Sequence, residues 1–212
     1  MKTFAFIDAS NLFYGGEKSL GWKIDYQKLF RYLQEKYEAS KVFYFGGVEI
    51  HDFPYDYQKE ETVPIEALEK HLVELLSNKG KTLNEEIILL IGRHLQRLRF
   101  YHKLDSFGYI LFLKPVKMYD QDDGTTKRKA NCDVDMAFHL MKEKDNFGRA
   151  VVLSGDGDFL PVLKHLREYK KKVVILARGP RTAREIRQFV GSEFRDFVRL
   201  EHALKYQEKK EK

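Results

Sequence analysis

Three acid-bearing segments, far apart in the sequence, could carry chemistry in this chain. They are FIDASN at residues 6–11, CDVD at residues 132–135 and SGDGDF at residues 154–159. Each lies where a strand is expected to end or a helix to begin, and ligands of open parallel sheets bind just outside the carboxyl ends of the strands. Carboxylates gathered there repel one another unless a cation holds them, and oxygen-only ligands suit Mg²⁺ or Mn²⁺. The segments therefore indicate metal-dependent phosphate chemistry.

Short apolar runs that alternate with helical patterns are expected to position these acids. This alternation predicts an α/β fold whose central, mostly parallel sheet is covered on both faces. Val134, Phe138 and Met141 repeat at helical spacing and predict a helix that begins at Asp133. The expected strands span residues 3–7, 41–48, 109–113, 150–153 and 173–177, and the expected helices between them span residues 25–37, 133–141 and 159–169.

Residues 51–100 fit this alternation less well. Two amphipathic patterns, at residues 61–77 and 84–100, predict a helical insertion between the second and third strands. Residues 120–129, DQDDGTTKRK, are polar and contain glycine, which predicts a mobile loop. We expect a single domain over residues 1–200, followed by a charged tail over residues 201–212 that frays.

Composition narrows the class of protein. The chain has 212 residues, of which 43% are hydrophobic, which suits one domain with a packed core. Its 38 Lys and Arg against 32 Asp and Glu give a net charge of +6, which allows a nucleic-acid partner without requiring one. A single cysteine, Cys132, excludes an internal disulfide and a cysteine-based zinc site. No signal peptide or membrane-length apolar run is found, so a soluble, cytoplasmic protein is expected.

Each acid also has an ordinary structural explanation. Asp8 could cap the next helix, and so could Asp158, which precedes an apolar helical run. Asp133 and Asp135 both gain from the dipole of the helix that they begin. Residues two apart on a helix do not share a face, so we expect one metal ligand from this pair. His139, four residues after Asp135, could simply pair with it.

Taken together, the segments resemble the NYN family of PIN-like nucleases. The first segment matches that family through Asp8 and Asn11, the second through residues 131–134, and the third matches its Ser-Gly-Asp-Gly-Asp-Phe motif at residues 154–159. Residues 114–117, KPVK, match its Lys-Pro-x-Lys motif. The resemblance covers about residues 3–50 and 100–200. Two departures occur, because Asn131 replaces the usual glycine and Ala130 stands where the family often carries lysine.

The resemblance implies a five-stranded PIN-like sheet in the order 3-2-1-4-5, with a site for Mg²⁺ or Mn²⁺. Asp8, Asp133 and Asp156 would hold the metal, and Asp158 would be a further or water-mediated ligand. Asn11 and Ser154 would orient water or an oxygen of the scissile phosphate. The implied activity is metal-assisted hydrolysis of RNA, most simply single-stranded RNA, by one or two ions.

Several basic residues flank this expected site in sequence and could bind phosphates, although a solvated loop would carry such charges anyway. They are Lys114, Lys117, Lys127, Arg128 and Lys129. Two other classes stay open. The chain could be a module that binds RNA or a protein with weak or no catalysis, or a phosphotransferase of another α/β family, although no Walker loop or Asp-x-Asp-x-Thr motif is found. The helical insertion could form a homodimer face or a substrate lid.

Overall fold

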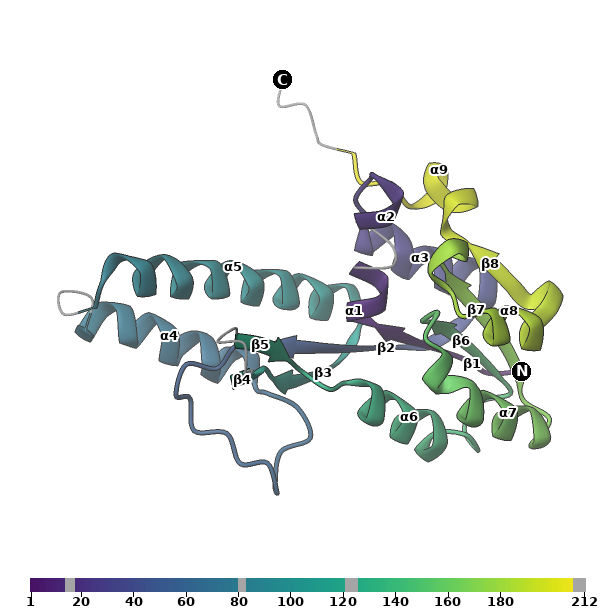
Figure 1. Ribbon diagram of the computed structural model, residues 1–212, viewed down its shortest axis with the longest axis horizontal. Coiled ribbons are helices and arrows are strands. Elements are labelled where there is room, and N and C mark those ends of the chain that lie inside the picture. The colour runs from purple at the N-terminus through teal and green to yellow at the C-terminus, as the bar shows by residue number, and fades with distance from the viewer. Residues whose placement is uncertain (14–17, 80–82, 121–125, 208–212) are drawn as a thin grey trace.

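A parallel six-stranded sheet forms the centre of the molecule, in the order β3-β2-β1-β6-β7-β8 (Figure 1). The computed structural model describes residues 1–13, 18–79, 83–120 and 126–207, and only the backbone of residues 78–79, 118–120 and 126–129. The predicted α/β class and the order of the five expected strands are confirmed. The strands are β1 (Thr3–Asp8), β2 (Ala39–Val48), β3 (Ile110–Pro115), β6 (Arg149–Leu153), β7 (Lys172–Ala177) and β8 (Phe194–Asp196).

The sixth strand, β8, was not predicted. It has three residues, Phe194, Arg195 and Asp196, and it pairs in parallel with the end of β7. So short a segment with two charged side chains has neither the apolar run nor the alternation that marks a strand in sequence. Its place is set by pairing with β7, which is a tertiary interaction.

The central strand β1 explains why the core has two halves. All six of its residues are buried, and successive side chains of a strand point to opposite faces. Ala5 and Ile7 belong to one hydrophobic cluster, and Phe4 and Phe6 belong to the other. The sheet therefore needs helices on both sides, and the apolar run TFAFI is the sequence signature of that double burial.

Helices cover both faces of the sheet (Figure 1). The short helices α1 (Ala9–Asn11) and α2 (Lys18–Leu20) follow β1. The first face carries α3 (Tyr26–Tyr37), the end of α5 (Glu85–Phe107) and α9 (Glu201–Leu204). The other face carries α6 (Asp133–Lys142), α7 (Leu160–Glu168) and α8 (Arg184–Val190). The expected helix at residues 25–37 is confirmed, with Asp25 as its cap: Asp25 Oδ1 accepts hydrogen bonds from the Gln27 and Lys28 N–H groups.

The helix expected from Asp133 is present as α6, but two residues of the repeat that predicted it lie outside its buried face. Val134 is 66% exposed and Phe138 is 55% exposed, whereas Met136, His139 and Leu140 are buried. Apolar residues lie on two neighbouring stripes of this helix, so periodicity alone fits either stripe. The buried stripe packs against Phe6, Phe43 and Phe45 on one face of the sheet.

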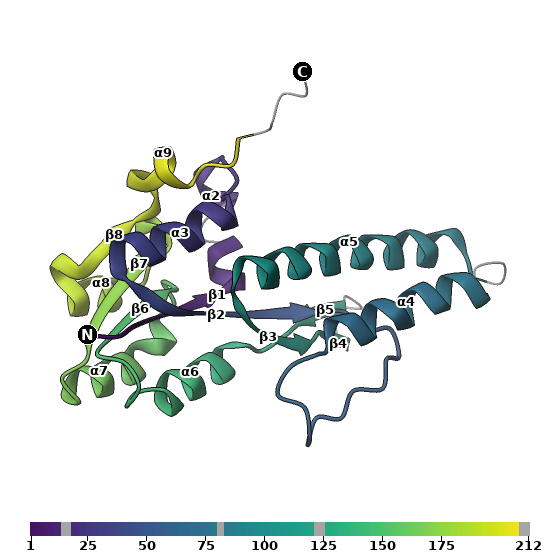
Figure 2. The ribbon, with the colours of Figure 1, turned by 180° about the vertical axis from the view of Figure 1, so that it is seen from behind.

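The helical insertion is an antiparallel pair of helices that projects from one end of the sheet (Figures 1 and 2). It consists of α4 (Ile65–Lys79) and α5, which pack on each other. The two helices were predicted, but α5 continues to Phe107, where Gly108 ends it with a φ of 99°. A Cβ at Gly108 would lie 2.9 Å from the Phe30 ring, so a close approach and a left-handed backbone both require glycine here.

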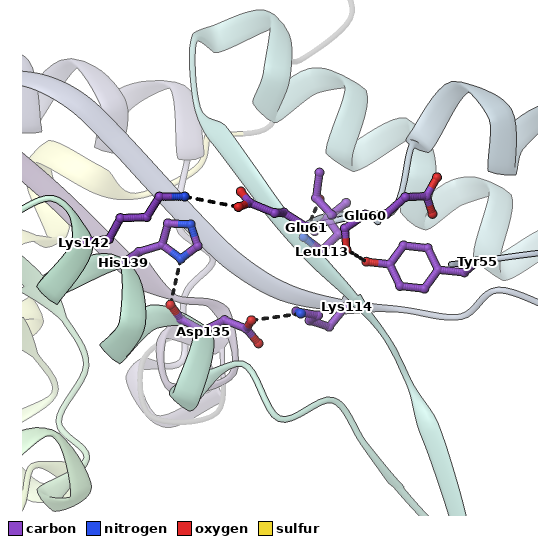
Figure 3. Close-up of polar contacts among 9 residues, drawn as sticks. Tyr55, Glu60, Glu61, Leu113, Lys114, Asp135, His139 and Lys142 are labelled. Atoms are coloured by element: carbon purple, nitrogen blue, oxygen red, sulfur yellow. Dashed lines mark hydrogen bonds and ion pairs between the residues drawn. The ribbon is translucent and has the colours of Figure 1, made fainter. Parts of the chain in front are cut away.

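The segment that leads into the insertion is tied to the outer edge of β3. The Val63 N–H donates to the Leu113 carbonyl at 2.9 Å, and Thr62 Oγ1 accepts from the Leu113 N–H at 2.8 Å. Lys142 Nζ on α6 lies 3.2 Å from Glu61 Oε1 (Figure 3). The base of the insertion is therefore fixed both to the sheet and to the helix that begins at Asp133.

Two further expectations differ from the structure. Residues 120–129 were expected to be a loop, but β4 (Lys117–Asp120) and β5 (Thr126–Lys129) form an antiparallel ladder; residues 121–125 lie outside the described residues. The charged tail was expected from residue 201, but residues 201–204 form α9 with Leu204 buried. No helix in the described parts of the chain is long and apolar enough to cross a membrane.

The docking of α9 generates a stability prediction. A chain that ends at Tyr206 keeps the buried Leu204, the hydrogen bond from the Asp25 N–H to the Leu204 carbonyl and that from the Tyr206 N–H to the Lys23 carbonyl. A chain that ends at Leu200 loses all three and should be less stable by about 3 kcal/mol. Urea unfolding followed by circular dichroism measures the difference. Equal midpoints for the two chains would show that α9 contributes nothing to stability.

Candidate active site

Asp8 ends β1 and has both a structural and a candidate chemical role. Its Oδ1 accepts a hydrogen bond from the Asn11 N–H at 3.0 Å, so it caps α1. Its Oδ2 accepts a hydrogen bond from Ser154 Oγ at 3.0 Å, across 146 residues of sequence. The side chain is 4% exposed. The cap that was the ordinary explanation for Asp8 is thus real, and it leaves the second oxygen directed at the neighbouring strand.

Asn11 and Ser154 join the ends of β1 and β6. These strands are neighbours in the sheet, with Ile7 opposite Leu153. Asn11 Oδ1 accepts a hydrogen bond from the Gly155 N–H at 3.0 Å, and Ser154 Oγ accepts one from the Asp156 N–H at 3.2 Å. The structure therefore brings together the first and third predicted segments at the carboxyl edge of the sheet.

Gly155 is required where the third segment turns. A Cβ on this residue would lie 2.7 Å from Thr182 Oγ1 and 2.9 Å from Thr182 Cα. The Gly155 carbonyl also accepts a hydrogen bond from the Ala183 N–H at 2.9 Å. A larger side chain would push the loop off the segment between β7 and α8 and would disturb the hydrogen bonds of Ser154 and Asp156.

Asp156 and Asp158 have different surroundings. Asp156 is half-buried and caps the 3₁₀ turn η2 (Gly157–Phe159), because its Oδ1 accepts a hydrogen bond from the Asp158 N–H at 3.0 Å. Asp158 is exposed in that turn. The alternative explanation of Asp158 as the cap of α7 is wrong: Phe159 occupies the N-cap position of α7 and makes no side-chain cap.

The two acids that begin α6 make different contacts. The charge of Asp133 raises the pKa of Asp8, which places the two carboxylates within electrostatic range. Asp135 instead forms an ion pair with Lys114, with 2.9 Å between Oδ1 and Nζ (Figure 3). His139 Nδ1 contacts the Asp135 carbonyl oxygen at 2.9 Å and not its carboxylate.

Burial controls the electrostatics of Asp8. Desolvation raises the pKa of the Asp8 carboxyl to about 6; the hydrogen bond from the Asn11 N–H opposes this shift, and the charge of Asp133 adds to it. The ionised carboxylate is therefore held in an unfavourable environment at neutral pH. A nearby cation would relieve both the desolvation and the repulsion, and the oxygen donors of Asp8 and Asp133 suit a hard cation.

The acids do not form a ready-made metal cage. In the part of the chain that the structure describes, no three His, Cys, Asp or Glu side chains are grouped so as to hold an ion. Asp8 and Asp133 are linked electrostatically, whereas Asp156 is linked to Asp8 only through its backbone N–H, which donates to the Ser154 hydroxyl; the Asp156 carboxylate caps η2. Cys132 is buried, and burial raises the pKa of its thiol to about 12, so it is neither a nucleophile nor a thiolate ligand.

The candidate substrate-binding cations are spread over several environments. Lys114 is paired with Asp135, and Lys117 is exposed with its Nζ 5.2 Å from the centre of the Tyr57 ring. Lys127, Arg128 and Lys129 lie on β5, and their side chains lie outside the described residues.

Two residues beside the third segment were missed by the sequence reasoning. Thr182 packs against Gly155, and a side-chain oxygen of Glu185 occupies the space beside Gly157. A signal was present, since residues 182–185 follow the strand predicted at 173–177 and so lie at the carboxyl edge. No motif marks them, and their contact with the glycines depends on tertiary packing.

The chain is similar in sequence or fold to several known proteins. The chain is 23% identical over 184 residues to the low amplitude and bright protein LabA of Synechococcus elongatus (strain ATCC 33912 / PCC 7942 / FACHB-805), covering 86% of this chain and 76% of that protein. The fold of this chain is similar to that of a protein of unknown function, VPA0982, from Vibrio parahaemolyticus RIMD 2210633. The TM-score is 0.55 at 17% identity, over 92% of this chain and 90% of that one.

A weaker likeness is found to the T5 D15 protein co-crystallised with metal ions, with a TM-score of 0.43 and 17% identity over 89% of this chain and 59% of that one. The model of the NYN domain matches residues 2–198, which is nearly the whole chain and includes all three acid-bearing segments. The chain therefore belongs to the NYN domain family.

Proposed function

We propose that this protein is a divalent-metal-dependent ribonuclease that hydrolyses single-stranded RNA at the carboxyl edge of its sheet. The observation that carries the proposal is the buried carboxylate of Asp8, whose pKa is raised to about 6 by burial and further by Asp133. Capping α1 does not require this charge, since an uncharged Asn or Ser would serve as the cap equally well. Membership of the NYN family and the modest positive net charge support the same assignment.

In this proposal Asp8, Asp133 and Asp156 hold the ion, Mg²⁺ or Mn²⁺, and exposed Asp158 reaches it through water. A bound ion would supply charge neutralisation on the phosphate and a water of lowered pKa. Asn11 uses its Oδ1 for the Gly155 N–H, which leaves its amide N–H groups to donate to a phosphate oxygen. No histidine or cysteine nucleophile is needed.

Ser154 has a narrower role than the one first expected. Its hydroxyl donates to Asp8 Oδ2 and accepts from the Asp156 N–H, so both of its hydrogen-bonding functions are used within the protein. We assign it as a positioning residue that holds Asp8 and the Asp156 turn in register, and not as a phosphate ligand.

The second candidate is a module that binds RNA without cleaving it. It is favoured by one observation: the described residues contain no preformed group of three metal-binding side chains. A cation that draws Asp8, Asp133 and Asp156 together would make the site catalytic, and a chain that never binds the ion would remain a binding module. Cleavage assays separate these outcomes.

The first prediction concerns cleavage. With Mg²⁺ or Mn²⁺ the protein should cleave single-stranded RNA, EDTA should stop the reaction, and Ca²⁺ should support it poorly because its coordination is looser. Asp8→Asn and Asp133→Asn should each lower kcat by about 100-fold or more, since loss of groups that merely orient metal ligands already costs 10–100-fold. Affinity for RNA, measured by fluorescence anisotropy, should change little. Gel assays of labelled RNA measure the rates.

Asp145→Asn is the matched control for cleavage, because Asp145 is exposed, forms an ion pair with Lys144 and lies outside the three acid-bearing segments. Activity that persists in Asp8→Asn at the wild-type rate would assign the cleavage to a contaminant. Tight RNA binding with no cleavage of any RNA or DNA tested would establish the binding module instead.

The second prediction concerns stability without metal. The pKa of Asp8 rises from 3.8 to about 6 on folding, so the folded state binds more protons between these pH values and stability falls as pH rises through them. Asp8→Asn keeps the oxygen that caps α1 and removes this cost. In EDTA at pH 7.5 the variant should be more stable than the wild type by up to about 2 kcal/mol, and the gain should vanish near pH 4.

Urea unfolding at several pH values measures this gain, with Asp145→Asn as the exposed control. Added Mg²⁺ should stabilise the wild type more than Asp8→Asn. A gain that is the same at pH 4 and pH 7.5 would contradict the assignment of a raised pKa to Asp8.

The third prediction concerns Ser154. Its hydrogen bond lowers the pKa of Asp8, so Ser154→Ala should shift the acid limb of kcat/KM to higher pH by about half a unit to one unit. Ser154→Thr keeps the hydroxyl and should restore the wild-type profile. RNA affinity should not change. An unshifted profile with a uniformly lower rate would indicate a phosphate ligand in place of a positioning residue.

A further inference from the structure

A hollow with a cavity volume of about 650 Å³ lies between α8 and the end of the chain's last strand. Two 3₁₀ turns, η3 (Gly179–Arg181) and η4 (Gly191–Glu193), and a third, η5 (Phe197–Leu200), form its walls. Three arginines line it: Arg187 from α8, Arg195 from β8 and Arg199 from η5. We call this hollow the arginine cleft. None of the three acid-bearing segments lines it.

The three arginines differ in how they are held. The Arg195 guanidinium donates hydrogen bonds to the carbonyls of Ser192 and Phe194 and lies 3.8 Å from Glu193 Oε2, so its position is set by the protein. Arg187 and Arg199 are exposed, and neither forms an ion pair with any other described residue. The cleft thus has one ordered guanidinium and two that can close on a ligand.

The single acid in the cleft does not neutralise these charges. Asp196 Oδ2 accepts from the Gly179 N–H at 3.1 Å and lies 3.6 Å from Arg178 Nη1, and its Oδ1 accepts from the Val198 N–H at 3.0 Å. Its charge is therefore taken up by Arg178 and two backbone donors. The lining keeps an excess of positive charge, which an anion must balance.

The arginine cleft lies on the same edge of the sheet as the candidate active site. The turn η3 follows the carboxyl end of β7, and Asp196 is the last residue of β8. Thr182, one residue after η3, packs against Gly155 in the third acid-bearing segment. Figure 1 shows β7, β8 and α8 side by side, and β7 pairs with β6, the strand that leads into that segment. A polyanion bound across the acids can therefore continue over the ends of β7 and β8.

We propose that the arginine cleft binds a backbone phosphate of the RNA strand, away from the scissile bond; this inference rests on the proposed function. Guanidinium groups present paired donors that match phosphate oxygens, and they do so better than lysine. Three such groups around one hollow suit the non-bridging oxygens of one or two neighbouring phosphodiesters, and the exposed rim suits a strand that passes through. The cleft would thereby set the direction in which the strand crosses the acids.

Binding measured in EDTA tests the proposal, because no cleavage occurs there. Affinity for a labelled single-stranded oligouridylate is measured by anisotropy over a range of salt for the wild type and for Arg187→Ala/Arg199→Ala. These two side chains make no ion pairs with described residues, so folding should be kept. The double variant should bind about tenfold more weakly at low salt. Its slope of log K against log salt should be shallower by about 1.4, which is two lost contacts at ~0.7 each for a single strand.

Two further variants sharpen the result. Arg31→Ala/Lys2→Ala removes the same charge from exposed residues that do not line the cleft, and it should leave the slope unchanged. Arg187→Lys/Arg199→Lys keeps the charge and should restore the slope, but only part of the affinity, since lysine lacks the paired donors.

Equal affinities and slopes for the wild type and the cleft variant would overturn the proposal. An equal loss of RNA affinity in the cleft variant and the control variant would also overturn the proposal, because it would show an effect of net charge alone. So would saturable binding of inorganic pyrophosphate that needs Arg187 and Arg199 while RNA binding does not, because the cleft would then serve a free phosphate ligand. If the protein does not cleave RNA but the cleft variant binds RNA more weakly, the proposed nuclease function is rejected and the proposed phosphate site in the arginine cleft is kept.

Discussion

The burial of one carboxylate at the junction of β1 and β6 is the constraint around which the site is arranged. Asp8 is buried, so its oxygens are satisfied by the Asn11 N–H and the Ser154 hydroxyl. These two bonds require that the chain after β1 turns at once into α1 and that the chain after β6 returns toward β1. The bond from the Gly155 N–H to Asn11 completes the link. The position of Thr182 against Gly155 then ties the end of β7 to the same arrangement.

Much of this architecture could be predicted, because the central strands of the sheet are buried on both faces. A strand such as β1 must be apolar at every position, and such runs are visible in sequence as well as in structure. The order of five strands and the helical insertion were predicted correctly. The ends of neighbouring parallel strands lie close together at one edge of the sheet. Residues 144 or more positions apart in sequence can therefore form hydrogen bonds there.

What could not be predicted depends on contacts between elements. Val134 and Phe138 fit a helical repeat, and so do the residues of α6 that are buried. Which stripe of the helix faces the core is decided by the packing of Met136 against the sheet. Asp133 and Asp135 could not be distinguished by sequence, because the ion pair between Asp135 and Lys114 depends on tertiary packing. The strand β8 and the arginine cleft it helps to form are made of charged, irregular sequence, and no periodicity marks them.

The segment that enters the helical insertion has a consequence for solubility. β3 is the last strand on its side of the sheet, and a bare outer strand offers its N–H and C=O groups to any other chain in an extended conformation. Thr62 and Val63 occupy those groups at Leu113 through a side-chain oxygen and a backbone N–H. Thr62 and Val63 lie just before α4 begins at Ile65, so the chain leaves the edge of β3 after bonding to it at Leu113. The start of the insertion therefore opposes growth of the sheet from one molecule into the next at this point of the edge.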